Sequence, residues 1–521
     1  MKESIDLKVS PEVAAMPLRL QAAASTALSV DVNRIAEIKI RRRSIDARQR
    51  KVMINLSLDV YLDQKPDPSE LAVTPPDYKD VTDSRQVIIV GAGPAGLFAA
   101  LRLLELGLKP VVLERGKSVD QRGADMARIS RENTVDPDSN YCFGEGGAGA
   151  YSDGKLYTRS KKRGSVEDIL KAFVVHGANS DILVDAHPHI GTDKLPLIIR
   201  NIRNTILSHG GEVHFSTRVE QLTIEDGKAV GVVTADGTSF RGPVILATGH
   251  SARDTYRMLD HAKVALEPKA IAVGVRLEHP QSLIDRIQYH NPGGRGKYLP
   301  AAEYSMLTRV DGRGVYSFCM CPGGTIIPAA TENGQLVVNG MSSASRGSKW
   351  ANSGMVVEVL PEDLKEYENE GVFKVMKFQE DIEHRFSADA NGSQNAPAQR
   401  MHDFVNGKPS QSLPPTSYAP GIHAARIDHL LPEFVAKRLQ KGFADFGRKA
   451  RGFLTNDAVL IGAETRTSSP IRIPRDNETM QHISTPGLYP CGEGAGYAGG
   501  IVSAAIDGRR CAEAAAQLLA E

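Results

Sequence analysis

Short apolar runs and helix-spaced apolar positions alternate along most of this chain, which predicts an α/β fold. Gln86-Val87-Ile88-Ile89-Val90 is a β-branched run that ends at a glycine-rich turn. Residues 97–106 then carry apolar side chains at helical spacing, and Pro110-Val111-Val112-Leu113 form a second apolar run. A strand, a turn, a helix and a strand in this order predict a βαβ unit.

The turn of this unit has the glycine spacing of a dinucleotide-binding loop, at Gly91, Gly93 and Gly96, and Glu114 ends the second strand. Gly91 permits the tight turn, Gly93 lets the backbone approach a pyrophosphate, and Gly96 packs the helix on the strand. The helix N-terminus supplies N–H donors for the phosphates. We therefore expect an adenine dinucleotide here, with Glu114 on the adenosine ribose hydroxyls.

Two later segments favour FAD over NAD. Val244 to Gly249 is a short apolar strand that would lie beside the first strand. Gly487 to Ile501 is a strand, a glycine-rich turn that carries Glu493, and a helix start. Both segments stand in the order found in the glutathione-reductase-like superfamily of FAD proteins, which the chain resembles. The resemblance implies that Glu493 binds the ribityl chain and that the following helix points at the N1–C2=O edge of the flavin.

Four more segments narrow this resemblance: Phe143 to Leu156, His189 to Leu195, Gly249 to Asp254 and Glu464 to Pro470. They look like the signatures of a bacterial family of FAD-dependent, "NAD(FAD)-utilizing" dehydrogenases, and the similarity covers nearly the whole chain. It implies an FAD fold and redox chemistry without a settled substrate. Together these arguments predict cofactor contacts at Gly91, Gly93, Pro94, Ala95, Gly96, Glu114, Arg115, Arg122, Gly147, Thr248, Gly249, Gly492, Glu493, Gly499, Gly500 and Ile501.

The sequence holds one complete dinucleotide fingerprint. Gly144 to Gly149 and Gly494 to Gly499 also match GxGxxG, but neither is followed by a strand that ends in an acid about 20 residues on. Both are interpreted as loops that contact the flavin. A pyridine nucleotide, NADH or NADPH, would have to bind transiently in the shared active-site cleft as an electron donor.

The predicted fold is a Rossmann-like FAD-binding domain with an inserted β-rich substrate domain and a small N-terminal α+β module. Residues 1–83 form the N-terminal module and its linker, and residues 84–255 the first part of the FAD-binding domain. Residues 256–454 form the substrate domain. Residues 455–521 return to the FAD-binding domain.

The substrate domain is predicted to be a β-sheet that covers the flavin. Its strand-like runs are 270–278, 314–320 and 335–339. Residues 361–381 and 430–446 are expected to be helices packed outside this sheet.

The N-terminal module is predicted to contain a strand near Ile5 to Val9 and a helix from Pro11 to about Ala27. A hairpin follows, with strands at Arg34 to Ile40 and Val52 to Leu58 and a tip at Arg41 to Arg48.

Seven basic residues lie between positions 39 and 51 of this hairpin. They could bind RNA, a phosphate-rich ligand or an acidic protein, or they could form a solvated hairpin. Residues 1–83 hold 13 basic and 13 acidic side chains, so the module is polarised without being basic overall. Nucleic-acid binding is therefore the less favoured of these interpretations.

Composition narrows the class of protein. The 521 residues suit two or three domains, and 63 basic residues against 62 acidic ones give no global attraction to nucleic acid or an anionic membrane. The sequence shows neither a secretory leader nor an apolar run near the ~20 residues of a membrane span. We expect a cytoplasmic protein with no membrane partner, and the sequence leaves its oligomeric state open.

Five cysteines without framework spacing argue against a secreted disulfide scaffold. On a strand, Cys319-Met320-Cys321 would place two thiols on one face. A metal site, a redox-active dithiol, and ordinary pocket or core residues are all compatible with this pattern. The sequence adds no second cysteine pair and no nearby histidine cluster, so a metal site is not expected.

Catalytic candidates are expected on loops that flank the flavin ring. His189 precedes a predicted helix start and His250 follows the Val244 to Gly249 strand, and histidine titrates in the range useful to a general acid or base. His189 is preferred to His250. Arg466 offers a rigid fork for a carboxylate or for the flavin's anionic edge. Weaker pocket candidates are Arg346, Asn352, Glu464, Ser468 and Arg472.

The favoured function is an FAD-dependent dehydrogenase or reductase that acts on a small organic substrate by hydride transfer through flavin N5. Two alternatives stay open. One is an RNA-modifying flavoprotein that positions RNA with the basic hairpin, and the other is a non-enzymatic flavin-binding redox sensor.

Overall fold

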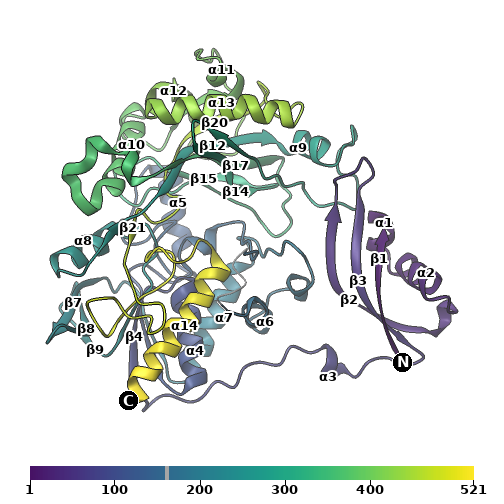
Figure 1. Ribbon diagram of the computed structural model, residues 1–521, viewed down its shortest axis with the longest axis horizontal. Coiled ribbons are helices and arrows are strands. Elements are labelled where there is room, and N and C mark those ends of the chain that lie inside the picture. Colours follow the sequence, from purple (N-terminus) through teal and green to yellow (C-terminus); the bar gives the residue numbers. More distant parts are fainter. Residues whose placement is uncertain (159–163, 521) are drawn as a thin grey trace.

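The computed structural model describes residues 1–158 and 164–520. Figure 1 shows an N-terminal module at one side, a parallel sheet with its helices, and a larger sheet with helices outside it. A long segment after the N-terminal module runs beneath the rest of the molecule before the parallel sheet begins. The fold is the predicted one: a Rossmann-like domain, a β-rich insertion and a small N-terminal module.

The N-terminal module is a three-stranded antiparallel sheet of β1 (Lys2–Val9), β3 (Met53–Leu62) and β2 (Ile35–Asp46), with β3 in the centre. Two helices, α1 (Pro11–Ala15) and α2 (Pro17–Leu28), accompany it, and α2 packs its apolar face on the sheet.

The single helix predicted from Pro11 to about Ala27 is therefore two helices. Met16, between them, has an extended backbone with φ −110° and ψ 108°. It precedes Pro17, whose ring clashes with a helical residue before it, so the helix stops and restarts there.

The basic hairpin is longer than predicted. β2 continues through residues 41–46, which the sequence assigned to the tip, and the turn lies at residues 47–52. Cross-strand ion pairs extend the pairing, because Arg41 Nη1 lies 3.2 Å from Asp59 Oδ2 on β3. Most of the charged run is thus part of a strand. After it, the linker forms one short helix, α3 (Pro68–Leu71).

The parallel sheet contains, in spatial order, β22 (Leu488–Pro490), β10 (Val244–Leu246), β4 (Gln86–Val90), β5 (Lys109–Leu113) and β6 (Glu212–His214). All of its pairings are parallel. The predicted βαβ unit is β4, helix α4 (Pro94–Leu106) and β5. β10 lies beside β4, as the sequence predicted.

Alternate residues of these strands face two different cores. One core joins Val87 and Ile89 to α4, α6 (Val166–Val175), α7 (Leu195–Ser208) and α14 (Ile501–Ala520). The opposite core joins Ile88 and Val90 to helix α8 (Arg253–His261) and a three-stranded antiparallel sheet. That sheet contains β7 (Val219–Glu225), β8 (Lys228–Thr234) and β9 (Ser239–Arg241). Burial on both faces explains the continuous apolar character of the parallel strands.

The inserted domain is built on a seven-stranded sheet. All of its pairings are antiparallel except that of the last two strands. In spatial order the strands are β13 (Leu307–Val310), β14 (Arg313–Cys321), β17 (Trp350–Val359), β12 (Ile271–Pro280), β20 (Val459–Glu464), β18 (Ala396–Arg400) and β19 (Ile422–Ala424).

The predicted strands at 270–278 and 314–320 correspond to β12 and β14. The run at 335–339 forms only the start of β16 (Val338–Met341), which pairs with β15 (Thr325–Pro328) outside the large sheet. Two further strands, β11 (Glu267–Pro268) and β21 (Ile471–Arg472), form a small antiparallel pair.

The two predicted outer helices are α10 (Lys374–Asp389) and α13 (Glu433–Lys449). The predicted helix at 361–381 starts late because Gly371, with φ 56°, interrupts a series of 3₁₀ turns before α10. The remaining helices are α5 (Arg122–Glu132), α9 (Gln281–Gln288), α11 (Met401–Val405) and α12 (Ile427–Leu430). Within the described residues, none of the helices is long and apolar enough to cross a membrane.

The chain returns to the parallel sheet later than predicted. β20 lies in the segment 455–521, which the sequence assigned to the FAD-binding domain, yet it pairs with β12 and β18 in the large sheet. The crossing therefore follows Glu464. The sequence could not show this, because a short buried strand looks alike in either sheet.

Candidate functional site

A cavity of about 390 Å³ lies between the parallel sheet and the large sheet. One wall consists of the loops after β4, β5 and β10, at the carboxyl edge of the parallel sheet, where open α/β sheets bind ligands. The start of α14 contributes to the same wall. The opposite wall comes from the inserted domain and the segment after β20, with Phe318, Cys319, Asn339, Gly340, Arg466 and Thr467.

The glycine loop after β4 has the shape that the motif predicted. Gly91 has φ 105°, and a Cβ there would lie 2.5 Å from the carbonyl oxygen of Ala247. At Gly93 the nearest atom to a Cβ would be 4.0 Å away, so the backbone is open toward the cavity. A Cβ at Gly96 would lie 1.9 Å from the Gly91 oxygen. Gly96 supports the loop and does not line the cavity, so its expected cofactor contact is corrected to a packing role.

Glu114 lines the cavity at the end of β5. Its Oε2 accepts from the backbone N–H of Ala92 at 2.8 Å, and Oε1 accepts from Gly116 at 2.9 Å and Gly144 at 3.0 Å. An ionised carboxylate has about four acceptor positions. Oε2 therefore keeps capacity for one further donor, which fits a hydroxyl of the adenosine ribose.

Arg115, the next residue, also lines the cavity, but its charge is already paired. Nη2 donates to Asp138 at 2.8 Å and Nη1 to Asp254 at 2.9 Å. The guanidinium lies 4.3 Å from the centre of the Phe143 ring. It supplies a stacked planar surface to the cavity.

Arg122 does not line the cavity, contrary to the expectation that it contacts the cofactor. It is fully buried, and it donates to the backbone oxygens of Glu145 at 2.6 Å, Asn140 at 2.7 Å and Gly147 at 3.0 Å. Burial lowers the pKa of Arg122. The side chain holds the loop at 140–151, whose residues Gly147, Ala148 and Gly149 do line the cavity.

The start of α14 is open toward the cavity. Gly499, Gly500 and Ile501 line it, and a Cβ at either glycine would meet no atom within 4 Å. Gly249, in the loop after β10 on the same wall, is equally open. Side chains at these glycines would occupy the space where a cofactor ring or chain must lie. Together with the acceptor left on Glu114, this cradle fits FAD.

Gly492 supports this region from behind. It does not line the cavity, and its N–H donates to Asp507 Oδ2 at 2.8 Å. Asp507 is held by Arg475 Nη2 at 2.6 Å. Glu493, the next residue, does line the cavity. The other expected cofactor residues, Pro94, Ala95, Thr248 and Gly249, are part of the lining as well.

The two histidine candidates differ in position. His189 does not line the cavity, and its Nε2 lies 3.1 Å from the backbone oxygen of Ala344, so it is a loop histidine bonded to backbone. Burial, with Arg346 nearby, lowers the pKa of His189. His250 lines the cavity, and its Nδ1 lies 3.4 Å from Glu493 Oε1. The preference for His189 is therefore corrected in favour of His250.

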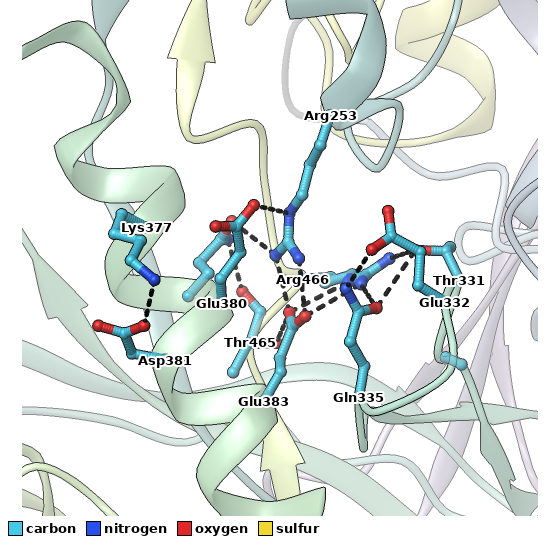
Figure 2. A network of polar contacts seen from close by, with 12 residues as sticks. Arg253, Thr331, Glu332, Gln335, Lys377, Glu380, Asp381, Glu383, Thr465 and Arg466 are labelled. Atoms are coloured by element: carbon cyan, nitrogen blue, oxygen red, sulfur yellow. Dashed lines mark hydrogen bonds and ion pairs between the residues drawn. The ribbon is translucent and has the colours of Figure 1, made fainter. Parts of the chain in front are cut away.

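Arg466 lines the cavity but serves a buried network. Its Nε and Nη2 donate to Glu383 at 3.1 and 3.0 Å, Nη1 donates to Thr331 at 2.7 Å, and Nη2 donates to Gln335 at 2.7 Å. Figure 2 shows Arg253 pointing toward the same Glu383 carboxylate, which it contacts at 2.8 and 2.9 Å. The two guanidinium groups overcome burial and hold the pKa of Glu383 well below its usual range. We call Arg253, Glu383 and Arg466 the arginine clamp.

The arginine clamp joins the two halves of the cavity. Arg253 begins α8, which packs on the parallel sheet, whereas Glu383 lies on α10 of the inserted domain. Arg466 follows β20 at the crossing between them. Its role is thus to fix the walls rather than to offer a free fork to a substrate.

The weaker candidates lie away from the cavity. Arg346 pairs with Asp153 at 2.5 Å, and Asn352 accepts from Arg276 Nε at 2.8 Å. Glu464, Ser468 and Arg472 are also absent from the lining among the described residues.

Sequence reasoning did not single out several polar lining residues, among them Lys155 and Asn339, and it left open whether Cys319 is a pocket residue. Lys155 donates to the backbone oxygen of Met320. The available signals were its place after Asp153-Gly154 in a glycine-rich loop and the Cys-x-Cys pattern that contains Cys319. The two cysteines do not alternate on a regular strand as expected, because a bulge lies between Phe318 and Cys321 and leaves Cys319 exposed and Cys321 buried.

The basic hairpin of the N-terminal module pairs several of its charges with carboxylates. Arg43 donates to Asp185 at 2.6 Å, and its backbone bridges to residues 184 and 186. Arg48 donates to Asp46 at 2.8 Å. The hairpin is thereby docked on the loop between α6 and α7, with Arg42 among the side chains left exposed.

Sequence comparisons give three family matches. Residues 270–467 match a family described as "FAD-dependent protein, C-terminal domain-like", and residues 84–136 match an FAD binding domain. Residues 1–61 match a domain of unknown function. An uncharacterized protein of Clostridium beijerinckii is 39% identical over 507 residues, which cover 93% of each chain.

Solved structures resemble the chain only distantly. A geranylgeranyl bacteriochlorophyll reductase-like protein from Thermoplasma acidophilum is 13% identical with a TM-score of 0.35, covering 84% of this chain and 79% of its own. A flavocytochrome c3 fumarate reductase is 13% identical with a TM-score of 0.32, covering 87% of this chain and 82% of its own.

Proposed function

This chain belongs to the same family as the uncharacterized Clostridium beijerinckii protein, and from its matches to an FAD-dependent C-terminal domain and an FAD binding domain we propose that it is an FAD-dependent oxidoreductase of a small organic molecule. The reaction is hydride transfer through flavin N5. The resemblance of its sequence motifs to "NAD(FAD)-utilizing" dehydrogenases supports the same proposal.

One observation carries it: a single cavity has a cofactor wall and a polar wall facing each other. Gly93, Gly249 and Gly500 leave the first wall open, and a helix starts there at each end. Asn339, Cys319 and other side chains of the inserted domain form the second wall. A protein that only stored the cofactor would have no need of a polar wall opposite it.

Residues of the chain would have separate roles in binding the cofactor. The N-terminus of α4, beyond Gly93, would bind the pyrophosphate, and the Glu114 carboxylate would accept a hydrogen bond from a ribose hydroxyl. The N-terminus of α14 stabilises negative charge that develops near it. Bound FAD supplies two-electron chemistry. His250, beside Glu493, can hold or release a proton at the cavity surface.

Nicotinamide dinucleotides are the electron donors that we propose to test first. A donor has to enter the same cavity, because the described residues contain one dinucleotide-binding βαβ unit, that of β4, α4 and β5.

Anaerobic stopped-flow spectroscopy of the purified holoprotein tests the proposal by following flavin bleaching near ~450 nm with NADH and then NADPH. His250→Asn should slow reoxidation of the reduced flavin by a quinone acceptor, the half-reaction that takes up a proton, by roughly 10²-fold or more, the contribution of a general acid or base. His189→Asn is the matched control, because this histidine lies outside the cavity, and its rate should stay near that of the unmodified protein.

Three results would contradict parts of the proposal. If the protein is purified without FAD and does not bind added FAD, it is not a flavoprotein. No bleaching with either nucleotide would remove the nicotinamide donor and would direct the search to substrates that reduce the flavin themselves. Equal slowing in both histidine variants would remove His250 from the chemistry.

A further inference from the structure

β14 is distorted where it reaches the cavity. Phe318 pairs with Gly354 on β17 and Cys321 pairs with Asn352, so three steps along β14 match two along its partner. This is a bulge of one extra residue, a feature common beside active sites. Cys319 within it has φ 47°, a left-handed conformation that is costly for a residue with a Cβ.

The bulge places two thiols in contact in different surroundings. Cys319 is exposed and lines the cavity, whereas Cys321 is fully buried behind it. The Cys321 thiol donates to the backbone oxygen of Cys319 at 3.3 Å. In a regular strand, Cα atoms two residues apart lie about 6.6–6.8 Å from each other, which is within the range that a disulfide spans.

Positive charge surrounds these thiols. Arg276, which is fully buried, donates to the oxygen of Cys319 at 2.7 Å and to the sulfur of Cys321 at 3.3 Å. Lys155 donates to the intervening oxygen of Met320. The hydrogen bond from Cys321, together with Lys155 and Arg276, lowers the pKa of Cys319 below that of a free thiol, while the same contact and burial raise the pKa of Cys321.

The negative charge that balances Arg276 in this cluster is incomplete. Glu464 Oε1 lies 3.1 Å from Arg276 Nη1, but burial raises the pKa of Glu464 to about 7. Near neutral pH this carboxyl is therefore partly protonated, and it leaves part of the Arg276 charge for the sulfurs. Asp153 is the other acidic group facing the thiols, and it is paired with Arg346 at 2.5 Å.

The remaining cysteines have none of these features. Cys142 lines the cavity, but its thiol contacts only the backbone oxygen of Ala329 at 3.8 Å. Cys491 and Cys511 are buried beside the Arg475–Asp507 pair. Among the described residues, Cys319 is the exposed thiol.

We propose that Cys319 and Cys321 form a redox-active dithiol that exchanges with low-molecular-weight disulfides entering the cavity, Cys319 as the attacking thiolate and Cys321 as the resolving thiol. The Cys319 thiolate attacks one sulfur of a disulfide RSSR, which gives a mixed disulfide and releases RS⁻. Cys321, losing its proton, then attacks the Cys319 sulfur and releases the second RS⁻. The protein loses two protons and two electrons as its disulfide forms, and RSSR gains them and becomes two RSH.

This inference goes beyond the proposed function. The exchange needs two thiols and a disulfide and involves no flavin step, so a protein with an inactive flavin could still perform it. The Cys319–Cys321 dithiol would be a second two-electron carrier in the same cavity. Through it, thiols and disulfides would also exchange electrons with the flavin.

The test uses the holoprotein and a dipyridyl disulfide at neutral pH, with release of the coloured pyridine thione followed over time. The unmodified protein should release two equivalents in one fast phase and lose two hydrogens by mass spectrometry. Cys321→Ser should release one equivalent and keep one pyridyl group on Cys319. Cys319→Ser should lose the fast phase, and Cys142→Ser, the matched cavity cysteine, should still release two equivalents.

Reaction of Cys319 with iodoacetamide at neutral pH provides a second readout, because it needs no disulfide to form. We expect it to be roughly tenfold faster than that of Cys142. A single equivalent released by the unmodified protein, or a fast phase that survives in Cys319→Ser, would overturn the proposal. Equal alkylation of Cys319 and Cys142 would do the same.

Discussion

Two buried arginines, Arg466 in the cavity wall and Arg276 behind it, have opposite surroundings. In the arginine clamp, Arg466 and Arg253 share Glu383, whose pKa lies far below its usual range. At the bulge, Arg276 faces Glu464, whose pKa is raised to about 7. The same pairing of arginine and glutamate thus gives a fully ionised cluster in one place and a partly protonated one in the other.

The difference lies in how many groups share the buried charge. Glu383 receives two guanidinium groups and the hydroxyl of Thr465 at 2.7 Å. Glu464 receives one guanidinium, and its Oε2 has no hydrogen-bond partner among the described residues. A complete network fixes a structure, whereas an incomplete one leaves charge and protons available for chemistry. The Glu383 cluster is therefore rigid, and the Glu464 cluster nearby is the reactive one.

The largest effect should come from breaking the clamp. Glu383→Gln removes the anion that the two buried guanidinium groups share and leaves Arg253 only Glu380, at 3.9 Å. Loss of one partner of a buried ion pair costs about 3–5 kcal/mol. The free energy of unfolding, measured by denaturant titration of the holoprotein, should fall by that order.

Asp381→Asn is the matched control for that variant. Asp381 also lies on α10 and pairs with Lys377, whose side chain is 37% exposed. Such a pair contributes about 1 kcal/mol or less. If both variants lose the same stability, the clamp has no special structural role.

A smaller effect, dependent on pH, is expected at the incomplete cluster. Burial raises the pKa of Glu464 from 4.5 to about 7, so the folded protein keeps a proton that the unfolded chain releases between these values. This carboxyl's contribution to stability is therefore full below pH 4.5 and is lost as the pH rises through about 7. Glu464→Gln removes the dependence.

Denaturant titrations of Glu464→Gln and the unmodified protein should be compared at acidic and at mildly alkaline pH. Relative to the unmodified protein, the variant should gain roughly 1–3 kcal/mol on going to the alkaline condition. A stability difference that is the same at both pH values would contradict a buried, partly protonated carboxyl.

The smallest effect should come from making the incomplete cluster resemble the clamp. Asn352→Asp would give Arg276 a second carboxylate at a position that now accepts from its Nε at 2.8 Å. The added negative charge should raise the pKa of Cys319 and slow its alkylation severalfold at neutral pH. Asn33→Asp, an exposed position in the N-terminal module, makes the same charge change and should leave the rate unaltered.

The features that sequence predicted well are those that consecutive residues determine. Gly91, Gly93 and the following helix define the βαβ unit within one segment, and the structure has that unit in the predicted place. The late glycine-rich turn and the start of α14 are local in the same sense. For these elements the spacing of glycines and apolar residues leaves few alternative conformations.

The features that it missed depend on contacts between distant segments. His189 and His250 both stand on loops after apolar runs, but His189 bonds to the Ala344 oxygen of the inserted domain whereas His250 lines the cavity. Arg122 was expected to contact the cofactor, but its guanidinium donates to backbone oxygens of the loop at 140–151. The bulge at Cys319 arises from register with β17, which no local pattern encodes.

The cofactor half of the molecule is closed by two segments far apart in the sequence. Arg102 on α4 donates to Glu513 on α14, 411 positions later, and β22 completes the sheet that β4 begins. During synthesis a ribosome must therefore finish the whole insertion before the cradle exists. Nascent chains would expose an apolar half-sheet until then, which makes this protein a natural client for chaperones that shield early strands.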